Sequence, residues 1–321
     1  MEIEKGDNAP LLADCLATET SKGAHSKAQF QARITRYGKA KSTALAVADY
    51  IRSESPDQSK LYHRIQHCGD HLVFRHYYTE DQIRLSHAKF CMKHLLCPLC
   101  AIRRGAKLLG RYLDRFEALK AENGSLRAYM VTFTVKDGPD LKERFNHLQK
   151  SLKYYHKLRH APNRACEAKK AEGAVWSYEI KRGKNSDLWH PHAHAIWLCS
   201  TPPDQSTISK QWHDITKDSF IVDVREIDQV EPVTGFLEVF KYAVKFSDQP
   251  LPDTWHCFQT LTGKRLIGSF GSFYGIPEPD DLLDDPLEGK PFVEYFFQFV
   301  GGSYKSSQHS TIKHREPLAL A

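Results

Sequence analysis

Hydrophobic and polar positions along this chain follow two different periods, and each period predicts a set of elements. Segments in which apolar residues alternate with polar ones, rich in aromatic and β-branched residues, predict strands. These segments are 72–78, 83–90, 127–135, 173–182, 190–199, 220–227 and 292–300. Apolar stripes at helical spacing predict helices at 42–55, 101–124, 141–160, 207–217 and 232–247. The order of these elements predicts an α+β fold in which helices cover a central antiparallel sheet.

Composition narrows the class of protein. The 321 residues are 41% hydrophobic and 11% aromatic, enough for a real core, and the formal net charge of +6 permits a nucleic-acid partner without requiring one. The start, MEIEKGDNAP, lacks the basic and apolar regions of a signal peptide, and no apolar run reaches the roughly 18 residues of a membrane span. We therefore expect a soluble cytoplasmic protein. In that reducing compartment, eight cysteines indicate metal binding rather than disulfides.

A group of cysteines flanks and follows the predicted hairpin at 72–90. Cys97 and Cys100 form the knuckle CPLC, whose spacing lets two thiolates reach one tetrahedral ion, and Cys68 with Cys91 can complete a zinc site. One thiolate can be replaced by a neighbouring histidine, of which there are three: His67, His87 and His94. The alternative is that these cysteines are reduced, buried packing residues.

The helix after the knuckle is basic. Between Lys89 and Lys120 there are eight Lys or Arg residues and only two acidic ones. Four of them recur at helical spacing on the face away from the leucines: Arg104, Lys107, Arg111 and Arg115. Together with Arg103, Lys241 and Lys245, they are the candidates to contact DNA phosphates. The alternative is an ordinary solvated helix face.

Three histidines alternate in HPHAHAIW, at 190, 192 and 194, so they share one face of a predicted strand. Glu179 in the preceding strand reaches the same place if the two strands pair. Two imidazoles and a carboxylate, with open positions for substrate, suit Mn²⁺ or Mg²⁺ acting on a phosphate oxygen. His190 competes with Glu179 as the third ligand of His192 and His194. The alternative is a half-buried strand with histidines on its wet face.

The predicted helix GFLEVFKYAVKFS places Glu238, Tyr242 and Lys245 on one face. Beside a metal-held phosphate, Tyr242 as phenolate can attack phosphorus, Lys241 or Lys245 can favour the phenolate, and Glu238 can later activate water or a hydroxyl. Taken alone, this helix is no more than amphipathic, and only its conjunction with the histidine strand makes it a candidate active site.

Taken together, these segments resemble the plasmid rolling-circle replication initiators, a branch of the HUH endonucleases. The resemblance runs from about Cys68 to about Tyr274 and comes as an ordered series. Its members are HCGDHLVFRHY, KFCMKHLLCPLCAIRR, YMVTFTVKD, HPHAHAIW, EVFKYAVK and, more weakly, KRLIGSFGSF. A single tyrosine matches the plasmid type rather than the two-tyrosine phage type.

The resemblance implies a role for each site residue. Tyr242 would be the nicking nucleophile, Glu238 the base for termination, and His192 with His194 the metal ligands, with Glu179 carrying over less securely. It also implies a fold, an HUH core of ferredoxin-like or RRM-like type with an N-terminal zinc-binding hairpin. We expect a tail at 1–27, a zinc-binding and basic region at 28–120, the catalytic core at 121–275, and an acidic loop with a C-terminal strand at 276–321.

The implied partner is the double-strand origin of a plasmid, single-stranded at the nick, with a host helicase and a single-strand binding protein acting alongside and no membrane. Three other functions are compatible with parts of the sequence. A conjugative relaxase or single-strand transposase shares the chemistry, a histidine-triad nucleotide hydrolase explains HPHAHAIW alone, and a zinc-dependent DNA-binding regulator explains the cysteines alone. The origin sequence, the metal used in the cell and the oligomeric state are not predicted.

Overall fold

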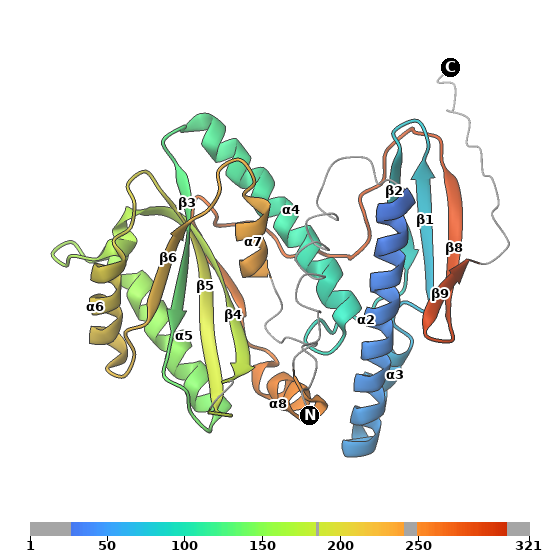
Figure 1. Cartoon of the computed structure of the whole chain (residues 1–321), viewed down its shortest axis with the longest axis horizontal. Coiled ribbons are helices and arrows are strands. Elements are labelled where there is room, and N and C mark those ends of the chain that lie inside the picture. Colours follow the sequence, from blue (N-terminus) through green and yellow to red (C-terminus); the bar gives the residue numbers. More distant parts are fainter. Residues whose placement is uncertain (1–26, 184–185, 241–248, 307–321) are drawn as a thin grey trace, which may run out of the picture. The chain divides into compact units, whose positions relative to one another are not determined.

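The computed structural model describes residues 27–183, 186–240 and 249–306, and these divide into two compact units. Unit 1 comprises the chain up to Lys107 together with the part from Pro279 onward, and unit 2 runs from Leu108 to Glu278. Each unit has its own antiparallel sheet (Figure 1). The predicted α+β class is therefore confirmed, with two sheets in place of the single central sheet that we expected.

Unit 1 consists of a long helix laid on a sheet of order β2-β1-β8-β9. Its elements are α2 (Lys27–Glu54), η1 (Pro56–Gln58), α3 (Ser59–Gln66), β1 (His71–Tyr77), β2 (Gln82–Ala88), the first turns of α4 (Pro98–Glu122), β8 (Val293–Val300) and β9 (Ser303–Ser306). Phe30 of α2 packs its ring against Phe74 and Phe297, at centroid distances of 5.0 and 5.8 Å. The predicted C-terminal strand thus pairs with the N-terminal hairpin and not with the sheet that contains β5, because its aromatic side chains complete the core under α2.

Unit 2 is built on a sheet of order β6-β3-β5-β4-β7. Its elements are the rest of α4, β3 (Arg127–Thr134), α5 (Leu141–Lys157), η2 (Leu158–His160), η3 (Glu167–Lys170), β4 (Ala171–Arg182), β5 (Trp189–Cys199), α6 (Gln205–Thr216), β6 (Val222–Glu226), α7 (Val233–Phe240), α8 (Leu251–Leu261) and β7 (Ile267–Gly271). The predicted hairpin of β4 and β5 is present and places Glu179 directly opposite His192.

The two faces of this sheet carry different side chains, because alternate residues of a strand point to opposite sides. On one face, aromatic residues of β3, β4 and β5 pack under α5 and α6, as in the stacking of Tyr155 on Trp197 and the contact of Phe133 with Trp212. The alternate residues, among them His192 and His194, therefore point to the opposite face. Helix α7 contacts β4 and β5 and lies across the sheet from α5 (Figure 1).

Several elements differ from their predicted bounds. Helix α2 begins at Lys27, well before the predicted 42, and α3, α8 and β9 were not predicted. The glycine-rich stretch at 268–277 contains strand β7, where Gly268 lies so close to the Trp176 indole that an added Cβ would be 2.3 Å from it. Glycine composition predicts a loop here, whereas the residue is needed for close approach to a neighbouring side chain.

Candidate active site and metal centres

Glu179, His192 and His194 converge on one point of the unit 2 sheet. Oε2 of Glu179 lies 2.8 Å from Nε2 of His192 and 2.8 Å from Nε2 of His194. The three ligand atoms all lie within 4.8 Å of one another, and Glu179 and His192 are only 4% and 5% exposed. Two imidazole nitrogens and a carboxylate oxygen from rigid, adjacent strands fit one divalent ion with coordination positions left over. We call this group the metal triad.

The surroundings of the metal triad favour its metal-binding state. Burial lowers the pKa of His192 below its ordinary value, although the Glu179 carboxylate opposes this shift, and neutral imidazole is the form that binds metal. Nδ1 of His194 lies 3.1 Å from the Thr132 hydroxyl of β3, which fixes the orientation of that ring. Such outer hydrogen bonds orient ligating histidines in metal sites. Sequence reasoning missed Thr132, although β3 and β5 pair it directly with His194.

His190, the competing third ligand, turns to another partner. Its Nδ1 forms a short hydrogen bond with Oδ1 of Asp137, and the Ser186 hydroxyl donates to Oδ2 of the same carboxylate at 2.8 Å. Of the two candidates, the structure therefore brings Glu179 to the two remaining histidines and keeps His190 with Asp137. The pairing of His190 with Asp137 was not predicted, because the two residues lie far apart in sequence and meet only where 138 and 189 form a β-bridge.

The segment predicted to carry the candidate nucleophile is described only up to Phe240, the last residue of α7. Glu238 is half-buried on α7, the helix that contacts β4 and β5. Tyr242, Lys241 and Lys245 lie outside the described residues. Tyr155 of α5 and Tyr178 of β4 are buried on the sheet face opposite the metal triad, and burial raises the pKa of Tyr178 to about 12.

The four predicted zinc ligands meet in unit 1. Sγ of Cys68 lies 3.5 Å from that of Cys100 and 3.6 Å from that of Cys97, and Sγ of Cys91 lies 3.5 Å from that of Cys100. Tetrahedral zinc with bonds of about 2.3 Å separates its sulfur ligands by about 3.8 Å, whereas a disulfide needs about 2.0 Å. The four sulfurs therefore fit a zinc ion. His67, His87 and His94 do not belong to this group.

Polar contacts hold the loops that carry these cysteines. Nζ of Lys41, itself buried, donates to the carbonyl oxygen of Cys68 at 2.8 Å, and Arg64 donates to the carbonyl of Cys91 at 2.9 Å. Hydrogen bonds from the other three thiols hold the pKa of Cys91 well below its ordinary value, while such bonds and burial raise the pKa of Cys97 and Cys100. The lowered pKa of Cys91 favours the thiolate, which is the form that binds zinc.

The basic side chains of α4 lie in different environments. Arg103 is 1% exposed and donates to the Leu282 carbonyl and to Asp284, so no DNA phosphate can reach it in this structure. Lys107 pairs with Asp281 and Asp285 of the acidic loop. Arg104 and Arg111 are half-buried, Arg111 with its guanidinium on the Pro277 carbonyl, and Arg115 is exposed. The predicted phosphate-contact stripe is therefore partly occupied by the chain itself.

The acidic loop has a structural role that its sequence did not reveal. Asp284 accepts hydrogen bonds from Arg33, Arg103 and the Leu85 amide. Burial raises the pKa of this carboxyl, but the two guanidinium groups outweigh burial and hold it well below its ordinary range. Asp284 therefore ties α2, α4 and β2 of unit 1 together.

Fold and site together define an α+β protein with a two-histidine, one-carboxylate triad on one sheet and a four-cysteine cluster beside another. Comparison with known proteins gives the family. The model of the Rep_1 replication protein family matches residues 82–293, more than half of the chain, and the chain therefore belongs to that family.

One curated relative is similar over a large part of its length. "Protein rep" of Streptococcus pneumoniae serotype 2 (strain D39 / NCTC 7466) is 27% identical over 221 residues, which cover 64% of this chain and 66% of the relative. The alignment thus spans slightly less than two thirds of that protein. No solved structure matches the chain significantly. Among the described residues, no helix is both long and apolar enough to cross a membrane.

Proposed function

We propose that this chain is a plasmid replication initiator that nicks one strand of origin DNA by tyrosine attack. The observation that carries the proposal is the convergence of Glu179 Oε2 with two histidine Nε2 atoms on one sheet face of a replication-family protein. Mn²⁺ or Mg²⁺ bound there would act as a Lewis acid on a non-bridging phosphate oxygen. Zinc at the four-cysteine cluster would be structural, because all four ligand positions come from the protein.

Each candidate residue then has its own role in the reaction. The phenolate oxygen of Tyr242 forms a bond to phosphorus, and the bond from phosphorus to the 3′ oxygen breaks. The products are a 5′-phosphotyrosyl link and a 3′ hydroxyl, which has taken up a proton and can prime synthesis. Lys241 and Lys245, close to Tyr242 in sequence, would favour the phenolate. At the end of the cycle, Glu238 would take the proton from water or from a new strand end.

Family membership favours this proposal over the alternatives. A nucleotide hydrolase leaves the cysteine cluster without a role, and a DNA-binding regulator needs no metal triad. A relaxase or transposase would share the nicking step and differ in the DNA that it recognises. Binding to origin DNA is part of the proposal, as is work alongside a helicase and a single-strand binding protein of the host.

Incubation with single strands that tile the plasmid carrying the gene, with and without Mn²⁺, tests the proposal. We expect one strand to be cut and to remain attached to the protein in a denaturing gel. Tyr242→Phe should abolish both the cut and the adduct while DNA binding persists, because only the nucleophilic oxygen is removed. Tyr154→Phe, on α5 and 46% exposed, is the matched control and should react normally. An adduct formed by Tyr242→Phe would overturn the assignment of the nucleophile.

A further inference from the structure

The register of the unit 2 sheet links the metal triad to the free edge of the sheet. Glu179 pairs with His192, and His192 pairs with Thr134 of β3. The Thr134 amide donates to the carbonyl of Ile221, just before the edge strand β6. Neighbouring strands lie 4.7–4.9 Å apart, so Ile221 lies roughly 10 Å from His192 in the same row. A single DNA strand covers that distance with about two or three nucleotides.

Two large apolar side chains are exposed at this edge. Phe220 is 63% exposed and Ile221 is 59% exposed. Phe220 lies edge-on to the ring of His213 on α6, at a centroid distance of 6.5 Å. Adjacent exposed apolar residues of this size commonly mark a surface that another molecule covers.

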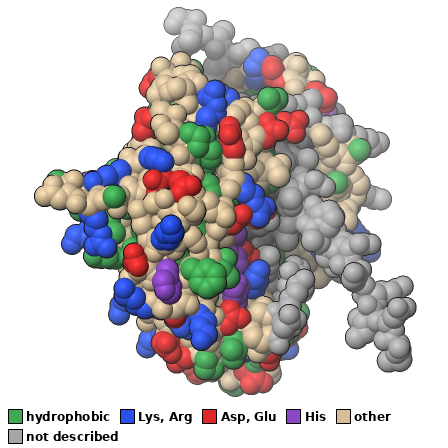
Figure 2. Space-filling model, turned by 60° about the vertical axis from the view of Figure 1, so that its left-hand side comes forward, with side chains coloured by type: hydrophobic (Ala, Val, Ile, Leu, Met, Phe, Trp, Pro, Cys, Tyr) green, Lys and Arg blue, Asp and Glu red, His purple; other side chains and the backbone are tan. Residues whose placement is uncertain are grey.

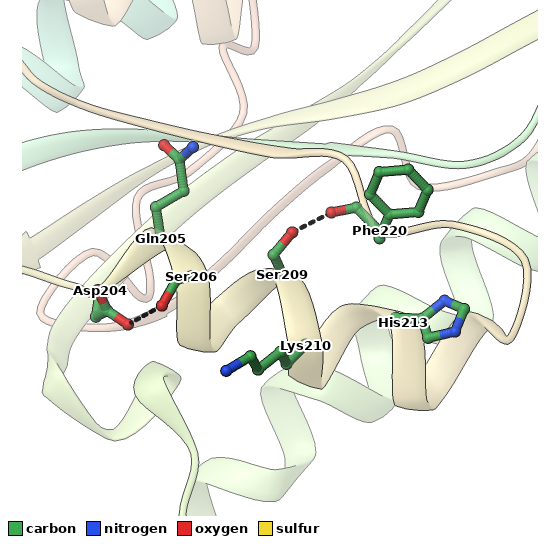
Figure 3. Close-up of a pocket in the computed structure, with 7 residues that line it drawn as sticks. All are labelled: Asp204, Gln205, Ser206, Ser209, Lys210, His213 and Phe220. Atoms are coloured by element: carbon green, nitrogen blue, oxygen red, sulfur yellow. Dashed lines mark hydrogen bonds between the residues drawn. The ribbon is translucent and has the colours of Figure 1, made fainter.

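A hollow of about 670 Å³ continues from Phe220 along α6. Figure 3 shows Ser209, Lys210 and His213 lining it on the helix, with the Phe220 ring at the His213 end. Asp204 lies at the opposite end, where its carboxylate caps α6 by accepting from the Thr207 amide at 2.8 Å. The hollow therefore has an aromatic end at His213 and Phe220 and an anionic end at Asp204, with Lys210 between them on the helix.

Two lysines contribute positive charge at this edge. Lys136, at the end of β3, and Lys210 are exposed, and neither is paired with a carboxylate among the described residues. Of the acidic residues in this part of unit 2, Asp218 pairs with Arg144, and Asp137 is hydrogen-bonded to His190. Asp204 lines the hollow together with Lys210. Figure 2 shows the α6 side of the molecule, where Lys and Arg side chains lie among Asp, Glu and apolar ones. The charge suits a phosphate backbone.

The backbone of the edge is already occupied, which disfavours an added protein strand. The Val224 amide donates to the side chain of Gln205 at 2.9 Å, and the Ser209 hydroxyl donates to the Phe220 carbonyl. A strand that augments a sheet needs these backbone groups. The exposed chemistry that remains is apolar, aromatic and cationic, and this combination binds single-stranded nucleic acid.

We propose that Lys136, Lys210, His213, Phe220 and Ile221, here called the edge patch, bind the single-stranded DNA that flanks the phosphate held at the metal triad. Bases stack on Phe220 and Ile221, and phosphates contact Lys136 and Lys210. This inference rests on the proposed function, since it takes the strand at the triad to be DNA. The edge patch makes the strand turn round the edge of the sheet, from the triad face to the α6 hollow.

Binding without chemistry tests the edge patch. The probe is a fluorescein-labelled oligo-dT strand of about 20 nucleotides, measured by anisotropy with no Mn²⁺ or Mg²⁺ added, because base stacking tolerates any sequence. Phe220→Ala/Ile221→Ala should weaken binding about tenfold or more, since stacking contributes about 1–3 kcal/mol per base. Val230→Ala, at an 89% exposed apolar residue elsewhere in unit 2, is the control and should bind like the wild type.

The lysines have their own readout. Lys136→Ala/Lys210→Ala should reduce the salt dependence of binding, lowering the slope of log K against log salt by about 1.4 for two lost phosphate contacts. Lys142→Ala/Lys153→Ala, exposed on α5, should leave the slope unchanged. Thermal unfolding of each variant at the wild-type temperature shows that these surface changes leave the fold intact.

Failure of the edge patch and failure of the proposed function give different results. If both double variants bind oligo-dT within twofold of the wild type, the edge patch is refuted, whether or not the wild type nicks DNA. Loss of binding to a protein partner alone, with DNA binding intact, would also refute it in favour of a protein-docking surface. If the wild type binds strands through the patch but never forms an adduct, the nicking function is refuted and the patch stands.

Discussion

At the scale of single residues, the geometry of the metal triad depends most on Glu179. Its Oε2 is the atom that both His192 and His194 approach, while His190 is held by Asp137 on the neighbouring row. Because His190 is already hydrogen-bonded to Asp137, it cannot take the place of Glu179 beside the two histidines. The two candidate third ligands should therefore differ in the effect of their removal.

Glu179→Gln should lower Mn²⁺ affinity and the rate of nicking by about a hundredfold or more, because the amide offers a neutral oxygen in place of the shared carboxylate. His190→Ala should reduce either quantity by about tenfold at most. Mn²⁺ titration followed by electron paramagnetic resonance gives the affinity, and a single-turnover cleavage assay gives the rate. A larger effect of His190→Ala would make His190 the third ligand.

His156 affects stability rather than the candidate active site, because it is buried away from the metal triad. Its ring lies between Trp176 and Phe270, at centroid distances of 4.5 and 5.2 Å, and neither ring nitrogen has a hydrogen-bond partner among the described residues. Burial lowers the pKa of His156 to about 3, and Arg159 adds to the shift. The unfolded chain takes up a proton near pH 6.5, whereas the folded chain does not, so stability is greatest above that pH and falls as the pH drops toward 3.

We expect His156 alone to lower the free energy of unfolding by about 2 kcal/mol when the pH falls from about 7 to about 5. In His156→Leu that part of the loss should disappear, since leucine does not titrate. Urea unfolding at the two pH values measures the difference. The exposed His63→Gln serves as control and should keep the wild-type loss. An equal loss in His156→Leu would show that His156 is protonated in the folded state or that other groups dominate.

At the scale of elements, sequence patterns predicted the paired strands of the site better than the elements around them. The alternation in 173–182 and 190–199 was sufficient to predict β4 and β5 and hence the meeting of Glu179 with His192. Strand β7 escaped prediction because Gly268 is required by the Trp176 indole, and only Gly271, with its φ of 61°, belongs to the turn that follows. The pairing of β8 with β1 was also not predicted, because the sequence of an aromatic strand does not indicate which of two sheets it joins.

Dependence on residues distant in sequence also explains why the environment of the basic side chains of α4 was not predicted. Helical spacing correctly gave α4 a charged face, but burial of Arg103 depends on Asp284, which lies far away in sequence. Likewise, Thr132 and Asp137 became part of the site only through strand register. Patterns within one segment therefore revealed the ligands, whereas the residues that orient those ligands required the folded chain.

Helix α7 carries a prediction about the end of the replication cycle. Glu238→Ala should nick supercoiled plasmid at close to the normal initial rate, because the first step needs the tyrosine oxygen and the metal but not this carboxylate. It should then fail to release unit-length circles and should accumulate longer single strands, since no base activates water or a new strand end. Gel analysis of replication products shows both effects. If initial nicking stops as completely as in Tyr242→Phe, Glu238 serves the first step.

At the scale of the whole molecule, the two candidate metal centres lie in different units. The four-cysteine cluster belongs to unit 1 and the metal triad to unit 2. A structural zinc site contributes folding free energy directly, whereas the triad sits on strands whose pairing does not require an ion. Loss of zinc should therefore destabilise unit 1 before unit 2.

Cys97→Ser should purify with no bound zinc, and amide hydrogen exchange should show loss of protection in β1, β2 and β8. The amides of β3, β4 and β5 should keep their protection. His192→Ala/His194→Ala is the matched control and should keep zinc and protection in unit 1. Zinc-free wild-type protein, by elemental analysis under reducing conditions, would contradict the assignment, as would equal deprotection of both sheets in Cys97→Ser.

Strand β8 occupies the interior of the unit 1 sheet, between β1 and β9, although more than 200 residues of chain separate it from β1. A ribosome releases the chain from its N-terminus, at about 5–20 residues per second. The hairpin β1–β2 and the long helix α2 are therefore made well before the strand that closes their core. All of unit 2 emerges in the interval and can fold first. A nascent chain stalled before residue 293 would expose the aromatic underside of α2, so this stage of synthesis is where a chaperone would be needed most.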